Sequence, residues 1–480
     1  MTDRPIIVLL RHDLRINDHA ALAAAASTGA PVIPLFVLDD GAAGDWAMGG
    51  ASRWWLHMSL ERLSARYREL GASLVLRRGD TLEIVAEVAE QANAASVYAS
   101  RAFVPWAVEL ETRLRDVLAA MGIAFKRFAG TLMHDPDLVR TQAGDPFKVY
   151  SPFWRAFEKT PPRPPKPAPK LMTVFAGNLA SDTLDDWGLL PQKPDWAGGL
   201  RETWHPGETG AQDRLATFLD ETVANYHDDR DRPDIEATSR LSPHLAFGEI
   251  SPAQCWHAAA AHAEQQLGAR KGVEKFLKEL GWREFSYHLL FHTPSLPVAP
   301  FRQEFAAFPW DGTEDALERW QRGRTGYPIV DAGLRELWHT GWMHNRVRMI
   351  VASFLTKDLR IPWQRGEAWF WDCLVDADLA SNAASWQWVA GCGADAAPYF
   401  RIFNPVTQSR KFDPDGRYIR KWVPELADLP DTCLHAPWVA TAVELASAGV
   451  ALGQTYPEPM VDHGLARVEA LALFDRIKAR

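Results

Sequence analysis

The stretch PIIVLLRHDLR, residues 5–15, leads from a run of six apolar residues into a charged turn. More short apolar or β-rich runs follow, at 31–38, 73–77, 96–99 and 124–128. Helical patterns lie between them, most clearly at 53–70 and 106–121. Short strands that alternate with helices predict a parallel, Rossmann-like α/β sheet in this part of the chain. The turn RHDLR contains no GxGxxG loop, so a nicotinamide dinucleotide site is not predicted.

A proline-rich segment divides the chain. Residues 160–170, TPPRPPKPAPK, cannot form a helix or a central strand, because proline removes a backbone donor and restricts the residue before it. From about residue 203 the helical period dominates, with capping signals at Ser251 and Thr313. We therefore expect an α/β domain at 1–132, an interdomain linker at 133–202 and an all-α domain at 203–480.

The composition is that of a globular protein with an unusual tryptophan content. The chain has 480 residues, 47% hydrophobic and 24% charged, enough for two or three domains. No apolar run approaches the ~18 residues that cross a bilayer, and Arg11 ends the first run too early for a signal peptide, so a cytoplasmic protein without membrane association is expected. The cysteines form no CxxC pair and are expected to be buried free thiols: Cys255, Cys373, Cys392 and Cys433. A net charge of -9 argues against a protein whose main role is to wrap nucleic acid but is compatible with a local basic patch.

Three segments place polar side chains beside large apolar ones. In ELGWREF (279–285) and HNRVRM (344–349), helical spacing puts an acid or amide, an arginine and a tryptophan or methionine on one face. These residues are Glu279, Trp282 and Arg283, and Asn345, Arg348 and Met349. In DADLASNAASWQW (376–388), Trp386 and Trp388 are two residues apart and cannot share a helical face. Such groupings are typical of a site that holds a flat, partly charged ligand.

Five segments of the chain match the motifs of one protein family in the same order. They are RHDLRINDHAAL (11–22), WHPGETGAQDRLATF (204–218), TSRLSPHLAFGEIS (238–251), TGYPIVDAGLRELWHTGWMHNRVRM (325–349) and APYFRIFNPVTQSRKFD (397–413). On these motifs the chain resembles the DNA photolyase and cryptochrome family over essentially its whole length. The resemblance implies an α/β antenna-binding domain followed by an all-α, FAD-binding catalytic domain, the same fold that the periodicity predicts.

The resemblance also implies the residues that hold FAD. Hydroxyl and backbone groups at 238–242 are the implied phosphate contacts, although a TSxxS string alone is more often a helix cap. The implied cofactor residues are Tyr226, Thr238, Ser239, Arg240, Leu241, Ser242, Glu279, Arg283, Trp342, Asn345, Arg348, Asp376, Asp378 and Asn382. Asn382 matches the position that faces the central redox nitrogen of the flavin. Photolyases generally carry asparagine there, plant cryptochromes aspartate and many animal cryptochromes cysteine, so Asn382 favours repair.

The implied substrate is a pyrimidine dimer in UV-damaged DNA, taken out of the duplex. Trp282 and Trp388 are implied to cover its apolar faces, and Glu279 to bond the base edges and stabilise the charge that develops during the reaction. Met349 and Asn345 match the enzymes that act on cyclobutane dimers.

Two further sets of residues follow from the resemblance. The implied electron-transfer chain from the flavin to the surface is Trp386, Trp363 and Trp310. The implied DNA phosphate contacts are Arg230, Arg283, Arg346, Arg401 and Lys411, with Arg283 an equally good candidate for the flavin site.

The antenna site departs from the family pattern. Val104 and Val298 stand where folate-binding relatives often carry a glutamate and a lysine, and Trp106 offers a ring for stacking a pterin instead. Methenyltetrahydrofolate is the first expectation for the antenna and a deazaflavin the second.

The resemblance implies a monomeric carbon–carbon lyase that splits cyclobutane pyrimidine dimers with light, by electron transfer from excited reduced FAD and without a metal. One alternative is a cryptochrome-type blue-light receptor, against which stand Asn382 and a C-terminal region that ends in a helical pattern at 465–479. A second is a (6-4) photolyase, which uses a histidine pair where only His344 is found in this segment. A tryptophan-rich glycan-binding protein would explain the 21 tryptophans but not the matched arginines and acids.

Overall fold

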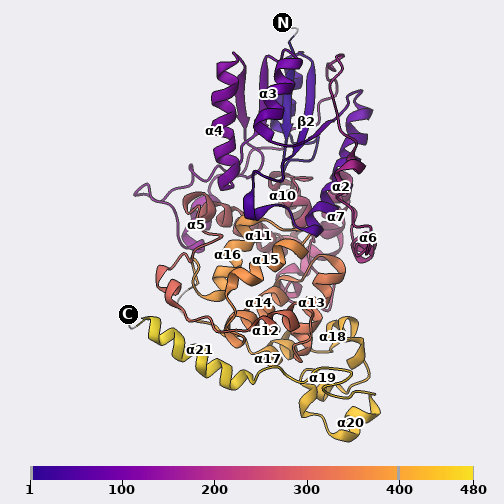
Figure 1. Ribbon diagram of the computed structural model, residues 1–480, viewed down its shortest axis with the longest axis vertical. Helices are drawn as coiled ribbons and strands as arrows, with labels where there is room; N and C mark the ends of the chain where they lie inside the picture. The colour runs from indigo at the N-terminus through magenta and orange to yellow at the C-terminus, as the bar shows by residue number, and fades with distance from the viewer. Residues whose placement is uncertain (1–3, 397–399, 479–480) are drawn as a thin grey trace. The chain divides into compact units, whose positions relative to one another are not determined.

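The computed structural model describes residues 4–396 and 400–478 (Figure 1). The chain forms two compact units, each assembled from several stretches of sequence. The first unit consists of Met1–Ala224, Ser239–Pro294 and Val375–Ala380, and the second of Asn225–Thr238, Ser295–Leu374 and Ser381–Arg480. The domain limits at 132 and 202 stay a prediction. Residues 397–399, which begin the last family motif, lie outside the described residues.

The first unit contains a parallel sheet of five strands, and all five predicted strands are confirmed. They are β1 (Ile6–Leu10), β2 (Val32–Leu38), β3 (Val75–Arg78), β4 (Ser96–Ser100) and β5 (Ala124–Phe128). Their spatial order is β3-β2-β1-β4-β5, so Ile7 of the central strand lies beside Ile33 and Val97. The chain moves outward in one direction from β1 to β3 and then crosses to β4, which creates a switch point between the carboxyl ends of β1 and β4.

Helices follow each of the first four strands: α1 (Ala20–Ser27), α2 (Gly50–Glu69), α3 (Thr81–Gln91) and α4 (Pro105–Ala120). The helices predicted at 53–70 and 106–121 are confirmed as α2 and α4. One sheet face, which includes Ile7 and Leu9, forms a buried core with α3 and α4 (Figure 1). The central strands β1 and β2 are rich in valine, isoleucine and leucine and are buried throughout, as in a parallel sheet that is covered on both faces.

The remainder of the first unit is helical. Its helices are α5 (Tyr150–Phe157), α6 (Gly198–Thr203), α7 (Glu208–Thr217), α9 (Ser242–Ala246), α10 (Pro252–Gln265) and α11 (Arg270–His292). Residues 161–169 of the proline-rich segment form neither helix nor strand, as predicted. Ser251 begins α10 with a capping box, in which its hydroxyl accepts from the Gln254 N–H and the Gln254 side chain accepts from the Ser251 N–H. The 23-residue α11, which carries the ELGWREF segment, packs against α5 and α10.

The second unit contains helices and, within its described residues, no strand beyond an isolated bridge between Leu452 and Tyr456. Its helices are α8 (Tyr226–Asp229), α12 (Glu314–Gln321), α13 (Pro328–Thr340), α14 (Asn345–Ser353), α15 (Trp363–Cys373), α16 (Leu379–Ala390), α17 (Pro405–Phe412), α18 (Arg417–Trp422), α19 (Asp431–Leu434), α20 (Ala442–Ser447) and α21 (His463–Lys478). The first residues of α16 belong to the first unit. Thr313 caps α12 as predicted, since its hydroxyl accepts from the Ala316 N–H. The fold class expected from the sequence is thereby confirmed.

Candidate functional site

The candidate site residues of the first unit are centred on α11. Glu279, Trp282 and Arg283 lie on this helix with the predicted spacing. Glu279 forms an ion pair with Lys275 one turn earlier, at 2.9 Å. The Trp282 ring is stacked on Tyr150 of α5, with ring centroids 3.7 Å apart and an angle of 9° between the planes. Trp282 keeps part of its side chain exposed, as a residue that binds a base must.

Arg283 makes its contacts inside the first unit. Its Nη1 donates to the Thr131 carbonyl at 3.3 Å and to Glu284 at 3.2 Å, and its guanidinium carbon lies 5.0 Å from the centre of the Tyr287 ring. The Tyr287 hydroxyl donates to Asp378 at 2.5 Å. Only 13% of the Arg283 side chain is exposed, so these contacts support a buried role for Arg283 better than a role on a DNA-binding surface.

Glu284 is a residue that the sequence argument missed. Its carboxylate is buried beside Arg283 and accepts from the Met133 N–H at 2.9 Å. Burial raises the pKa of Glu284 to about 7, although Arg283 and two backbone donors act in the opposite direction. From the sequence alone, a glutamate in the middle of an amphipathic helix is expected to face solvent. The fold instead places Glu284 against residues 131–134.

The segment expected to contact phosphate groups runs from Thr238 to Ser242 and then into α9. Thr238, Ser239 and Arg240 are half-buried, Ser242 is exposed and Leu241 is buried. Arg240 has a φ of 49°, in the left-handed region, which turns the chain sharply just before the helix. The Ser239 hydroxyl lies 3.5 Å from the Leu241 N–H. The segment offers three hydroxyl groups next to a turn.

In the second unit, Asn345 is the first residue of α14, and Arg348 and Met349 follow on the same helix as predicted. The Arg348 Nε donates to the Met343 carbonyl at 2.7 Å, and the guanidinium carbon lies 5.9 Å from the centre of the buried Trp342 ring. These contacts fix the direction of Arg348 at the start of α14.

His344 caps α14, and it is the histidine on which the (6-4) photolyase alternative depends. Its Nδ1 accepts from the Arg346 N–H at 3.1 Å, so this nitrogen carries no proton. Burial lowers the pKa of His344 to about 3. His344 is therefore a neutral helix cap.

Asn382 of α16 is buried, and its side-chain amide donates to the main-chain oxygen of Glu367 on α15 at 3.0 Å. The Glu367 side chain is also buried, and burial raises its pKa to about 9, so this carboxyl is protonated at neutral pH. Both Glu367 carboxyl oxygens lack a hydrogen-bond partner among the described residues. Glu367 is a second residue that the sequence argument missed.

The tryptophans of the expected electron-transfer chain differ in exposure. Trp386 and Trp363 are each 2% exposed, whereas Trp310 is partly exposed and packs on Phe308 with ring centroids 4.5 Å apart. Trp386 packs edge-on against Phe370, at 5.0 Å. A side chain at Gly366 would meet the Trp386 ring at 2.1 Å, so this glycine permits the close approach of α15 and α16.

Trp388 is partly exposed, in contrast to Trp386, as the two-residue spacing predicts. Its indole N–H donates to the Asp395 carbonyl at 3.2 Å, and the Arg401 guanidinium lies 5.9 Å from its ring. The buried Lys357 donates to the carbonyls of Val389, at 2.7 Å, and Arg401, at 3.2 Å, and so ties the Arg401 segment to α16.

Three of the expected DNA contacts lie together in the second unit. Arg346 forms an ion pair with Asp231 at 2.7 Å, and Arg230 approaches the same carboxylate at 3.7 Å. The Arg346 guanidinium and the Lys411 ammonium lie 4.4 Å and 5.0 Å from the centre of the Phe412 ring. We refer to Arg230, Asp231, Arg346, Lys411 and Phe412 as the basic cluster.

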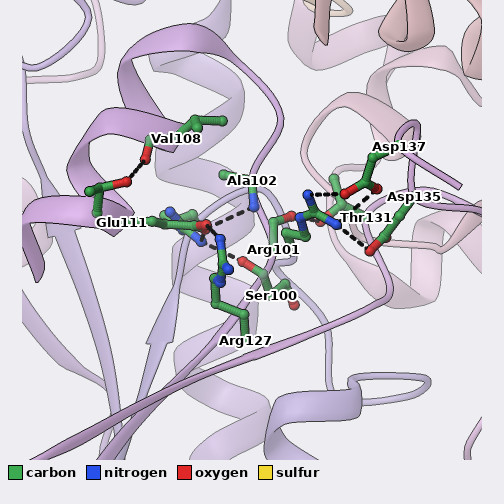
Figure 2. A network of polar contacts seen from close by, with 11 residues as sticks. Ser100, Arg101, Ala102, Val108, Glu111, Arg127, Thr131, Asp135 and Asp137 are labelled. Carbon is green, nitrogen blue, oxygen red and sulfur yellow. Dashed lines mark hydrogen bonds and ion pairs between the residues drawn. The ribbon is translucent and has the colours of Figure 1, made fainter. Parts of the chain in front are cut away.

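A network of polar side chains lies at the switch point of the sheet, a common ligand site in this type of fold (Figure 2). Glu111 of α4 is 2% exposed and accepts from Arg11 at 2.6 Å, Arg127 at 3.2 Å and the Ala102 N–H at 2.8 Å. Beside it, Arg101 is paired with two aspartates, Asp135 at 2.6 Å and Asp137 at 2.9 Å. At the start of α4, Val104 and Trp106 are half-buried, while Val298 of the second unit is 63% exposed.

Two findings concern the described residues as a whole. Across 4–396 and 400–478, the helices are too short or too polar to cross a membrane. Over the same ranges, no three histidine, cysteine or acidic side chains are grouped to bind a metal ion. The four cysteines are buried and free, as predicted.

Comparisons with known proteins agree on one family. The family model described as DNA photolyase matches residues 6–170, and that of the FAD binding domain of DNA photolyase matches residues 276–476. The deoxyribodipyrimidine photo-lyase of Agrobacterium fabrum is 48% identical over 475 residues, which cover 99% of this chain and 98% of the relative. Cryptochrome-1 of Arabidopsis thaliana is 37% identical over 98% of this chain and 71% of the relative.

The solved structures give the same result. A bacterial class III photolyase from Agrobacterium tumefaciens has a TM-score of 0.96 and 48% identity, over 100% of this chain and 99% of that chain. A cryptochrome from Synechocystis has a TM-score of 0.88 and 29% identity, over 98% and 99%. With relatives this similar over nearly the whole length, the chain belongs to the DNA photolyase family.

Proposed function

We propose that this protein uses light to split cyclobutane pyrimidine dimers in UV-damaged DNA, as a carbon–carbon lyase. The observation that carries the proposal is the 48% identity to a deoxyribodipyrimidine photo-lyase over 99% of the chain. The cryptochrome relative is less similar, at 37% identity.

The residues of α15 and α16 fit a flavin. Buried polar groups normally find a hydrogen-bond partner, yet the Glu367 carboxyl oxygens and the Trp386 indole N–H have none among the described residues. The protonated Glu367 and the neutral amide of Asn382 place no negative charge in this region, which suits a reduced, anionic flavin. When bound, reduced FAD supplies the photoexcited electron donor.

The cofactor contacts that we propose are those matched to the family. Hydroxyl and backbone groups at 238–242 bind the pyrophosphate, with Tyr226 close by in sequence. Arg348, held by the Met343 carbonyl, supplies positive charge, and Asn382 presents its amide to the ring. The remaining proposed contacts are Glu279, Arg283, Trp342, Asn345, Asp376 and Asp378.

For the substrate we propose that the partly exposed rings of Trp282 and Trp388 stack on the bases, and that Met349 and Asn345 complete the contacts. Glu279 accepts or donates a hydrogen bond at the base edges, where charge develops. The basic cluster and Arg401 bind DNA phosphates, which position the strand without reading its sequence.

The alternatives are each opposed by one residue. A (6-4) photolyase places a histidine pair in its pocket, whereas this segment contains only His344, whose Nδ1 caps α14. A cryptochrome-type receptor of the plant kind carries an acid at the position of Asn382.

Three finer points are also proposals. We propose methenyltetrahydrofolate as the antenna, stacked on Trp106, with a deazaflavin as the second candidate. The ion pairs around the buried Glu111 support a position for the pigment away from the ends of β1 and β4. We further propose that the protein is a cytoplasmic monomer, which size-exclusion chromatography with light scattering tests for the oligomeric state.

The decisive experiment is a repair assay. The reduced holoprotein is mixed with oligothymidine that contains cyclobutane dimers, and absorbance in the thymine band is followed under near-ultraviolet or blue light. Absorbance should recover in the light and stay constant in the dark or with oxidised flavin. No recovery by a fully reduced, FAD-loaded protein would refute the proposal.

A further inference from the structure

A short helix just before the proline-rich segment supports the ring of Trp282. The sequence YSPFWRAF forms α5, and the side chains of Tyr150, Phe153, Trp154 and Phe157 are buried along one stripe. Their spacing of three, four and seven residues is that of an amphipathic helix. This apolar stripe packs against α11.

Gly281 allows α5 to approach α11 closely. A Cβ atom at this position would lie 2.4 Å from atoms of the Trp154 ring and 2.9 Å from the Tyr150 hydroxyl oxygen. Real Cβ atoms do not approach other atoms so closely, so any other residue here would push the two aromatic rings away. Gly281 immediately precedes Trp282, and the space it leaves brings Tyr150 to the tryptophan.

The Tyr150 ring is held firmly. It is 8% exposed, and its hydroxyl donates to the Lys278 carbonyl of α11 at 2.6 Å. The ring also packs edge-on against Phe285, with centroids 5.8 Å apart, and stacks on Trp282, at 3.7 Å and 9°. Tyr150 thus covers one face of the indole and fixes the plane of the ring. An indole that is already ordered loses less conformational entropy when a base stacks on it.

We propose that Tyr150 is a positioning residue for the pyrimidine dimer, which acts by holding the Trp282 ring in its binding orientation. This inference rests on the proposed function. The effect of Tyr150 on the substrate passes through the indole on which its ring is stacked.

The test compares binding of dimer-containing and undamaged oligothymidine by the FAD-loaded protein. In Tyr150→Leu the stack is lost, and dimer affinity should fall roughly 2- to 10-fold, the cost of ordering one freed side chain on binding. Affinity for undamaged DNA, FAD content and the repair rate at saturating dimer should stay at wild-type values. Tyr150→Phe keeps the ring and should bind the dimer within about 2-fold of wild type.

Phe153→Leu is the matched control for a loosened α5. Phe153 is buried on the same helix and packs on Phe285 and His288, each at 5.2 Å, and it makes no ring contact with Trp282. This variant should bind the dimer like wild type. If Tyr150→Leu does not retain FAD, Tyr150→Met takes its place, because methionine fills space flexibly.

A double-mutant cycle with Trp282→Ala separates positioning from general packing. In the Trp282→Ala background, Tyr150→Leu should cause no further loss of dimer affinity. An equal loss in both backgrounds, or an equal loss on damaged and undamaged DNA, overturns the inference. If wild type prefers and repairs the dimer while Tyr150→Leu binds it equally well, the inference fails and the proposed function stands. A wild-type protein without dimer preference or repair removes both.

Discussion

The side-chain nitrogen of Asn382 lies 3.0 Å from the main-chain oxygen of Glu367. A carbonyl oxygen only accepts hydrogen bonds, so the amide donates here and its own oxygen remains as an acceptor. The bond joins α16 to α15 at two buried residues, next to a carboxyl group that is protonated at neutral pH.

Asn382→Asp should therefore produce an acid with a pKa above its usual range, because only the protonated form can donate to the Glu367 carbonyl. The folded state then binds more protons than the unfolded state, and the free energy of unfolding of the variant falls relative to wild type as pH rises above about 4. Urea unfolding of both proteins from pH 4 to 7.5 measures this. A difference that does not change with pH would contradict it. We also expect slower accumulation of fully reduced flavin under light, and slower repair with dimer binding kept.

The stability of Glu367→Gln relative to wild type should increase with pH. The folded-state pKa of Glu367 is raised to about 9, so between its unfolded value and pH 9 the unfolded state is ionised while the folded state keeps the proton. Stability of wild type is lost over this window, by about 1.4 kcal/mol per pH unit for one proton. Glutamine has no titratable proton, so the variant does not lose stability over this pH window. Its advantage in urea unfolding should grow by roughly 2–3 kcal/mol from pH 5 to pH 7 and vanish near pH 4.

Trp386→Phe should abolish light-driven reduction of oxidised FAD but leave repair largely intact once the flavin is reduced chemically. Phenylalanine keeps the contact with Phe370 and cannot be oxidised as readily as indole. Flavin absorbance under constant light is the measurement. Trp204→Phe, at another buried tryptophan, is the control and should photoreduce normally. Wild-type photoreduction in Trp386→Phe would show that the chain is wrong or bypassed.

In the basic cluster, removal of a positive charge and removal of the negative charge should have opposite effects on DNA binding. Arg346→Ala or Lys411→Ala should weaken binding to all DNA and reduce the slope of log K against log salt by about one. Asp231→Asn removes the carboxylate that neutralises Arg346 at 2.7 Å, and it should tighten binding at low salt. Titrations of undamaged duplex at several salt concentrations test both. If both types of variant leave the slope unchanged, the DNA surface lies elsewhere.

Trp282→Ala should weaken dimer binding by roughly 1–3 kcal/mol, the usual size of a lost base–aromatic stack. FAD content and affinity for undamaged DNA should be unchanged. An equal loss on damaged and undamaged DNA would assign Trp282 to general binding or to folding.

The sequence predicted those features that depend on local pattern. The five strands, the caps at Ser251 and Thr313, and the different burial of Trp386 and Trp388 follow from runs and spacings within a few residues. The features it missed depend on contacts between distant segments. Glu367 lies in WQRGEAWFWDC, directly after Gln364, Arg365 and Gly366, where an acid resembles a solvated position, and its burial is decided by packing.

The helix α5, which precedes the proline-rich segment, is a second feature that the sequence analysis did not predict. The linker predicted at 133–202 contains YSPFWRAF, which forms α5, and the apolar stripe of this helix is buried because α11 packs against it. Tyr150 and Trp282 are 132 residues apart in sequence (282 − 150), and no local pattern links them. The sequence does not decide whether Arg283 binds the flavin or DNA. Its buried contacts with Thr131 and Glu284 depend on the fold.

The buried Glu111 at the ends of β1 and β4 has a consequence for the colour of the protein (Figure 2). A pigment seated at that edge would have to displace Arg11 and Arg127 from this carboxylate, which would leave a buried charge without its partners. The network around Glu111 therefore disfavours a pigment at this edge of the sheet. Any absorption band of the purified protein beyond those of the flavin should belong to a pigment held elsewhere, and it should persist when Arg11 is replaced.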